Sequence, residues 1–171
     1  MKISAQEEYG LRCLLRLAAS PHPSLTLPEI GAAEGLSPTY VAKLMAVLRD
    51  AGLIESVRGR SGGYRLAKDP EEIGLGSLLL VLGDPLFDEE GYCQRHSGTA
   101  PDGVCVHHGD CSLKALWATL EQWMRGTLNQ ITLADLIEHE GRITDLLRAR
   151  LATTVFDDAA PLVSLGTMTK A

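Results

Sequence analysis

The sequence predicts a mainly α-helical protein that carries one small β-hairpin. Hydroxyl residues twice stand just before a proline-containing apolar pattern, which is typical of helix starts. Apolar residues also recur at helical spacing along a long segment that follows residue 111. A turn rich in arginine and glycine separates two short apolar runs, which predicts the hairpin. The 171 residues are enough for one domain with an appendage.

The N-terminal part of the chain predicts three helices. Leucine and alanine at helical spacing indicate the first helix over residues 5–19, before a proline-rich loop. Thr26 is the expected N-cap of a short second helix that ends at Gly35. Ser37 is the expected N-cap of the third, which ends at Gly52. Two helices joined by a tight turn that contains glycine form a helix-turn-helix.

The hairpin is expected directly after the third helix. Residues 53–57 form its first strand and residues 64–67 the returning strand, joined by a turn with arginines at its ends. Gly62 and Gly63 would allow a positive φ at the tip and a close approach of the backbone. A helix-turn-helix followed by a basic hairpin is a winged helix, and we expect this domain to occupy residues 1–83.

The distribution of charge supports nucleic-acid binding, although the net charge is −6. Residues 1–70 carry nine Lys or Arg and seven Asp or Glu, whereas residues 71–171 carry seven and fifteen. Six of the positive residues lie within residues 43–68, which hold only two acidic residues. The alternative is an ordinary solvated face. The basic segment coincides with the third helix and the hairpin.

The expected DNA contacts come from two places. The second helix of a helix-turn-helix enters the major groove by its N-terminal end, where hydroxyls and lysine contact phosphates or base edges. Arginines on a wing suit phosphates or a narrow minor groove. Core packing is the alternative for the tyrosine. The candidate residues are Ser37, Thr39, Tyr40 and Lys43 on the helix, and Arg58, Arg60, Ser61 and Gly62 on the wing.

Three of the four cysteines lie in one glycine-rich segment. Cys93, Cys105 and Cys111 are separated by eleven and five residues. We expect the segment, residues 84–111, to be a loop without helix or strand. Three thiolates in a loop form a soft-ligand site, which selects zinc, copper(I) or an iron–sulfur cluster. Two histidines lie before the third cysteine, so a structural zinc site is the alternative to an iron–sulfur cluster.

Several further features limit the functions that the sequence allows. Cys13 lies in an apolar helical run and is expected in the core. The start of the chain lacks the apolar stretch of a secretory signal, and no apolar run of about 18 residues predicts a spanning helix. We therefore expect a cytoplasmic protein with reduced thiols and no membrane partner, which favours metal over disulfides. No nucleophile and base form a recognisable pair, so no enzyme is expected.

The last third of the chain predicts association between two copies. We expect residues 112–150 to form dimerisation helices and residues 151–171 to form a mobile tail. The alternative for the apolar stripe of the long helix is packing onto its own domain. The stripe consists of Leu113, Leu116, Trp117, Leu120, Trp123, Met124, Leu128 and Ile131.

Together these motifs resemble the IscR/NsrR/RirA-type bacterial regulators of the Rrf2 family. The resemblance implies a homodimeric transcription regulator, a repressor, that binds a roughly palindromic double-stranded DNA operator. It also implies that the three cysteines hold an iron–sulfur cluster whose state controls DNA affinity. The resemblance covers the chain to about residue 140. It rests on the cysteine triad and on residues 1–4, 9–12, 35–41, 48–54, 58–66, 115–117 and 132–136.

The sequence departs from the family pattern around the cluster. The first cysteine gap is longer than in IscR-like members, and Lys114 stands where they have a ligating histidine. NsrR-like members use an acidic residue from the first helix of the other subunit, and the corresponding residue is Glu8. The resemblance thus makes Glu8 the first choice for fourth ligand and favours 4Fe–4S over 2Fe–2S. His96, His107 and His108 are rivals, and a zinc-stabilised DNA-binding protein without a cluster switch is the alternative function.

Overall fold

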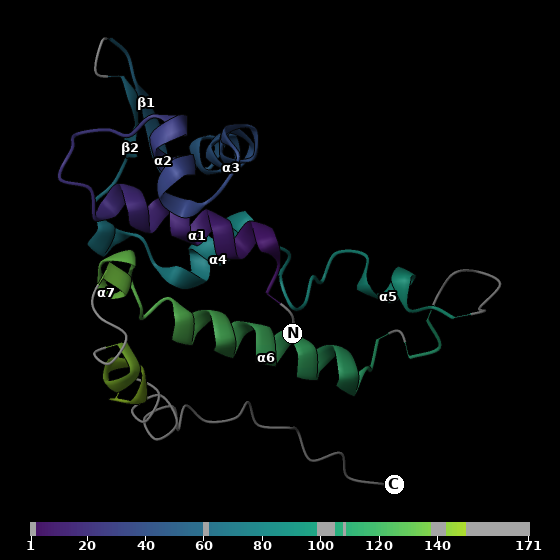
Figure 1. Cartoon of the computed structure of the whole chain (residues 1–171). Helices are drawn as coiled ribbons and strands as arrows, with labels where there is room; N and C mark the ends of the chain where they lie inside the picture. The colour runs from purple at the N-terminus through teal and green to yellow at the C-terminus, as the bar shows by residue number, and fades with distance from the viewer. Residues whose placement is uncertain (1–2, 60–61, 99–104, 108, 138–142, 150–171) are drawn as a thin grey trace, which may run out of the picture. The chain divides into compact units, whose positions relative to one another are not determined.

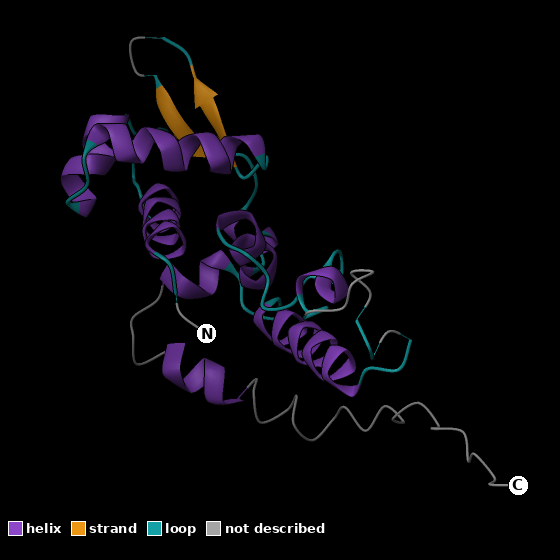
Figure 2. Cartoon of the chain, turned by 90° about the vertical axis from the view of Figure 1, so that its right-hand side faces the viewer, coloured by secondary structure: helices purple, strands orange, loops and turns teal. Residues whose placement is uncertain are grey.

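The structure, a computed structural model, describes residues 3–59, 62–98, 105–107, 109–137 and 143–149. The chain divides into two units, Met1–Ile137 and Glu138–Ala171. In the first unit, the hairpin and the long helix α6 lie on opposite sides of the remaining helices (Figures 1 and 2). The described part of the second unit is helical over residues 143–149. Within the described ranges, no helix is both long and apolar enough to cross a membrane.

The first unit is mainly helical, as the sequence predicts. Its elements, in chain order, are α1 (Ala5–Ala18), α2 (Leu27–Glu34), α3 (Pro38–Asp50), β1 (Ile54–Val57), β2 (Gly63–Leu66), a 3-10 helix (Pro70–Glu72), α4 (Leu75–Leu82), α5 (Tyr92–Arg95), α6 (Ser112–Leu128) and α7 (Leu133–Ile137).

Capping side chains determine where the first three helices begin. Ser4 and Thr26 each form a capping box with the glutamate three residues later. The Ser37 hydroxyl accepts a hydrogen bond from the Tyr40 amide at 3.2 Å. At the other end of α2, Gly35 adopts a φ of 68°. The predicted N-caps of α2 and α3 are thereby confirmed, and each is worth about 1 kcal/mol.

One apolar core joins α1, α3, α4 and α7. Leu14, Leu44 and Leu78 from the first three of these helices are almost fully buried, and so is Leu133 of α7. The Leu133 amide also donates to the Ile73 carbonyl oxygen at 2.8 Å. Consequently α7 packs against the winged helix of residues 1–83, here called the winged unit, although α7 falls in the range 112–150 expected for dimerisation.

The prediction that Cys13 belongs to the core is confirmed, because its side chain has no exposed surface. Burial, reinforced by the nearby Glu34 carboxylate, raises the pKa of the Cys13 thiol to about 11. This cysteine is therefore a small apolar residue of the core and lies apart from the other three in chemistry.

The hairpin is attached to the helices at its base. β1 and β2 pair antiparallel with Ile54 opposite Leu66. Tyr64 exchanges two main-chain hydrogen bonds with Leu25 of the α1–α2 loop, at 2.8 and 3.0 Å. The base of the hairpin is thus tied to the segment that precedes α2.

Of the two roles expected for the glycines of the tip, the structure shows a close approach of the backbone but no positive φ. Neither Gly62 nor Gly63 has a positive φ, whereas Gly59 does, at 115°. Their role is close approach: a Cβ on Gly63 would lie 2.5 Å from the Leu25 carbonyl oxygen, and one on Gly62 would lie 2.7 Å from that of Val57. Any side chain there would displace the backbone of the hairpin.

The apolar stripe predicted along α6 contains residues that pack within their own unit, here called the inner face, and residues that stay exposed, here called the outer face. The inner face contacts α4: Met124 and Leu128 line a groove there, and Ser77 donates through its amide and hydroxyl to Asn129 Oδ1 at 2.8 and 3.1 Å. Ile131 is buried in its own unit, so it is not available to a second chain. The outer face stays exposed and consists of Leu113, Leu116, Trp117, Leu120 and Trp123.

The cysteine-bearing segment contains a helix that the sequence analysis missed. Cys93 lies in α5, a single turn in the part of the chain expected to be loop. Aromatic side chains support this turn: the Phe87 and Tyr92 rings lie 5.1 Å apart, and those of Tyr92 and His96 lie 4.4 Å apart. Arg95 also donates to the Glu90 carbonyl oxygen at 2.9 Å. Such local contacts stabilise a turn that lacks apolar periodicity.

Candidate DNA-binding surface and cysteine site

The first turns of α3 present polar side chains to solvent. Thr39 and Lys43 are exposed, one turn apart on the helix. Ser37 is exposed too, but its hydroxyl already caps the helix. Tyr40 is half-buried, and its ring meets the Tyr9 ring edge to face at 6.0 Å. Thr39 and Lys43 are therefore available as donors on this surface. Tyr40 packs against Tyr9, as in the alternative that we considered, and its contact with DNA stays a prediction.

The wing adds one described basic side chain at its tip. Arg58 is exposed directly after β1. Arg65, in β2, pairs with Glu55 across the strands at 2.6 Å, so its charge is partly compensated. Arg60 and Ser61, which we also expect to contact DNA, lie outside the described residues. The described wing thus supports Arg58 as an available cation.

An ion-pair cluster between α1 and α2 escaped the sequence analysis. The Glu34 carboxylate accepts from Arg12 Nε at 3.0 Å and from Arg16 Nε at 2.7 Å. Burial alone would raise the pKa of Glu34, but the hydrogen bonds and charges of Arg16 and Arg12 outweigh burial and lower it. The only sequence signal was two arginines at helical spacing, and nothing in that spacing named their partner.

The three clustered cysteines are free and half-buried. Cys111 is the N-cap of α6, and its Sγ accepts from the Lys114 amide at 3.4 Å. Lys114 Nζ pairs with Glu89 Oε1 at 2.8 Å. The Glu89 carboxylate raises the pKa of Lys114, and Cys93 and Cys111 add smaller contributions of the same sign. Both thiols therefore lie within electrostatic range of one ammonium group.

The thiols do not form a ready-made metal site within the described parts of the chain. Among those residues, no three His, Cys, Asp or Glu side chains are arranged to hold a metal ion. His96 Nδ1 lies 2.8 Å from the Tyr92 carbonyl oxygen, His107 is exposed, and His108 lies outside the described residues. Glu8 is exposed on α1. Among the described residues, Glu8, His96 and His107 are not brought into a group with the thiols.

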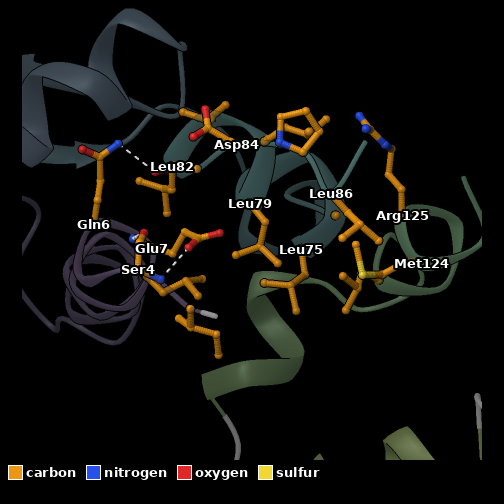
Figure 3. Close-up of a pocket in the computed structure, with 18 of the residues that line it drawn as sticks. Ser4, Gln6, Glu7, Leu75, Leu79, Leu82, Asp84, Leu86, Met124 and Arg125 are labelled. Carbon is orange, nitrogen blue, oxygen red and sulfur yellow. Dashed lines mark hydrogen bonds between the residues drawn. The ribbon is translucent and has the colours of Figure 1, made fainter. Parts of the chain in front are cut away.

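A groove of about 970 Å³ runs between α1, α4 and α6 (Figure 3). Leu75, Leu79 and Met124 supply apolar walls, and Glu8 also lines it. The Gln6 side chain spans from α1 to α4 by donating to the Leu82 carbonyl oxygen at 2.7 Å. Glu8 therefore lies at a groove that α6 helps to line, and α6 also carries the exposed apolar residues.

Comparison with known proteins agrees with this architecture. Residues 3–139 match the family model Rrf2, described as an iron-dependent transcriptional regulator. The chain is 34% identical to the transcriptional regulator NsrR of Halalkalibacterium halodurans, over 88% of this chain and 99% of that protein. It is 31% identical to the transcriptional regulator IscR of Serratia proteamaculans, over 82% of this chain and 81% of that one.

A solved structure gives the same fold with a different described role. CymR, the global cysteine regulator of B. subtilis, superposes with a TM-score of 0.60 at 30% identity, over 80% of this chain and 96% of that one. By their names, NsrR and IscR are transcriptional regulators and CymR is a global cysteine regulator, so this fold serves more than one described role.

Proposed function

Since the chain belongs to the Rrf2 family of transcription regulators, we propose that it is a homodimeric, sequence-specific repressor controlled by an iron–sulfur cluster. The observation that carries the proposal is the joint presence, in one chain, of a winged helix with exposed donors and three free, half-buried thiols. The family supplies DNA binding and regulation, whereas the cluster, the dimer and the individual contacts are our proposal.

The DNA-reading part consists of α3 and the wing. Thr39 and Lys43 would reach base edges or phosphates from the first turns of α3. Arg58 would contact a phosphate or the minor groove from the hairpin, together with Arg60, Ser61 and Gly62. Because the Ser37 hydroxyl caps α3, Ser37 would position that helix more than it reads DNA.

The homodimer is supported by the outer face of α6. Leu113, Leu116 and Trp123 expose 57%, 53% and 46% of their surface, and they share one stripe with Trp117 and Leu120. Contiguous apolar surface of this kind marks an interaction site in a soluble protein. A twofold pairing of α6 with its counterpart would place two α3 helices to read a roughly palindromic operator.

The donor set fits an iron–sulfur cluster. Three thiols of reduced cysteine are soft ligands, and Cys93, Cys105 and Cys111 would hold the group, which supplies a redox-sensitive centre when bound. Glu8 of a second subunit is the proposed fourth ligand, because it corresponds to the acidic residue that NsrR-like regulators use. Its exposure at the groove beside α6 leaves it accessible. Lys114 is engaged with Glu89 in place of a ligating histidine, and we favour 4Fe–4S over 2Fe–2S.

A test separates this proposal from a zinc-stabilised protein. The chain is purified without oxygen, and its visible spectrum, iron, sulfide and zinc are measured. We expect a brown protein with iron and sulfide, and operator affinity that differs between the loaded and the stripped forms. A colourless protein with one zinc per chain, or equal affinities of both forms, would reject the cluster switch and leave the zinc-stabilised alternative.

A further inference from the structure

We propose that Glu34, held by two arginines of α1, is a positioning residue that fixes how α3 is presented to DNA. Glu34 is the last residue of α2 and directly precedes the Gly35 turn that leads into α3. The inference rests on the proposed role of α3 as the DNA-reading helix. Glu34 itself makes no DNA contact in this proposal.

Three hydrogen bonds tie the end of α2 to α1. Arg12 Nε and Arg16 Nε donate to the two carboxylate oxygens of Glu34, at 3.0 and 2.7 Å. A terminal nitrogen of Arg12 also donates to the Glu34 main-chain carbonyl oxygen at 2.9 Å. Side chain and backbone of the same residue are therefore held by α1. Charge-assisted bonds of this kind are the strong ones and have defined directions.

The start of α3 is held by the same face of α1. The Tyr9 ring packs against Tyr40, in the first turn of α3, and Arg12 lies 5.4 Å from the centre of the Tyr9 ring. Tyr9, Arg12 and Arg16 share one face because their spacings are three and four residues. In Figure 1, α1 passes below α2. One helix thus holds both sides of the turn between α2 and α3.

The cluster differs from an ordinary surface ion pair, which contributes little. The Glu34 side chain is only 9% exposed, whereas Arg12 and Arg16 are 40% and 46% exposed. The two arginines lower the pKa of Glu34 despite its burial, so the carboxylate is held in its charged form. Removing either arginine would leave the mostly buried Glu34 carboxylate with fewer partners.

Substitution of Glu34 by glutamine distinguishes a positioning role from a purely electrostatic effect, because the two predict opposite changes in operator affinity. The change removes one negative charge, so long-range electrostatics alone would strengthen binding to every DNA. A positioning role predicts weaker binding to the operator with unchanged or stronger binding to unrelated DNA. Asp50→Asn is the matched control, because Asp50 ends α3, pairs with Arg49 at 3.0 Å and is exposed.

The probes are a duplex that the wild-type chain selects from a random pool and a scrambled duplex of equal length. Affinities are measured over a salt series at a temperature where thermal unfolding shows every variant folded. For Glu34→Gln we expect the operator-to-scrambled ratio to fall about tenfold, which corresponds to ~1.4 kcal/mol, at an unchanged salt slope. Asp50→Asn should keep the wild-type ratio.

Further variants distinguish a failure of the positioning role from a failure of the proposed DNA-reading role of α3. Arg12→Lys keeps the charge but cannot make the paired contacts of a guanidinium, so its ratio should also fall. If Glu34→Gln does not fold, Arg16→Gln removes one of the three bonds and should lower the ratio. Wild-type ratios in the folded variants would overturn the positioning role. If Thr39→Ala with Lys43→Ala also leaves operator binding intact, the proposed reading helix itself is wrong.

Discussion

Glu121, a buried carboxylate in the middle of α6, accepts a hydrogen bond from the Leu86 amide at 3.0 Å. It also pairs with Arg125 one turn later on the same helix. The segment that leads to the cysteines is thus attached to the inner face of α6 by a charged group. Buried charges are tolerated only when such partners exist.

Replacing Glu121 with alanine should destabilise the first unit by about 2 kcal/mol, because the Leu86 amide and Arg125 would be left without a charged acceptor. Urea unfolding would measure the change. Gln122→Ala on the same helix is the control, since Gln122 is exposed. Equal destabilisation of both variants would mean that the bond to Leu86 contributes nothing specific.

Replacing any one of Cys93, Cys105 and Cys111 with alanine should remove most iron and sulfide from protein purified without oxygen, because each thiol is a proposed ligand. Cys13→Ala should keep them, as Cys13 is buried in the core. Iron and sulfide analysis gives the result. Full iron content in the Cys105→Ala protein would contradict the assignment.

The wing should act through phosphates. Replacing Arg58 or Arg60 with alanine should weaken binding to all duplexes and reduce the salt slope by about one for each phosphate that is no longer neutralised. Arg65→Ala should have a smaller effect, because Arg65 pairs with Glu55. Fluorescence anisotropy over a salt series makes the comparison, and an unaltered slope in an Arg58→Ala, Arg60→Ala protein would show that the hairpin does not touch the DNA backbone.

Charging the outer face of α6 should produce monomers. Leu116→Glu with Leu120→Glu places two carboxylates on the exposed stripe, where they would be desolvated in a dimer. Sedimentation at micromolar concentration should show a monomer with weak operator affinity, whereas Gln122→Glu should stay dimeric. A wild-type chain that sediments as a monomer would refute the dimer.

Cys13 should make stability fall at high pH. Its pKa is about 11 when folded, against an ordinary value of 9.0, so between these values only the unfolded chain loses the proton. The free energy of unfolding should therefore drop by about 1.4 kcal/mol per pH unit above pH 9. Denaturation of the wild type and Cys13→Ala from pH 8 to 10.5 isolates this slope, which would be identical in both proteins if Cys13 had no role.

The sequence predicted the winged unit well because its signals are local. The hydroxyls of Thr26 and Ser37 cap helices by accepting from amides only three residues later, and the hairpin strands are adjacent in sequence. The α5 turn was missed because it depends on ring contacts between side chains without apolar periodicity. Glu34 and Glu121 were missed for a different reason: their partners lie on other segments, and spacing alone does not reveal such pairings.

The site was predictable in its residue types and less so in its geometry. Cysteine chemistry identified three thiols, and the structure describes all three as free. It does not join them into a metal site within the described residues. A stripe read from periodicity also could not say which of its residues face inward, and Ile131 and Met124 belong to the inner set.

The two faces of α6 have a consequence for how such regulators diversify. Outer residues such as Leu116 and Trp123 are exposed, whereas Glu121 binds the Leu86 amide and Leu128 lines the groove beside α4. Effects of substitutions far apart on the helix, as at Leu113 and Leu128, should be nearly additive, whereas residues one turn apart should couple. In the proposed dimer, changes confined to the outer face would therefore let related chains acquire mutually exclusive pairing without altering the winged helix.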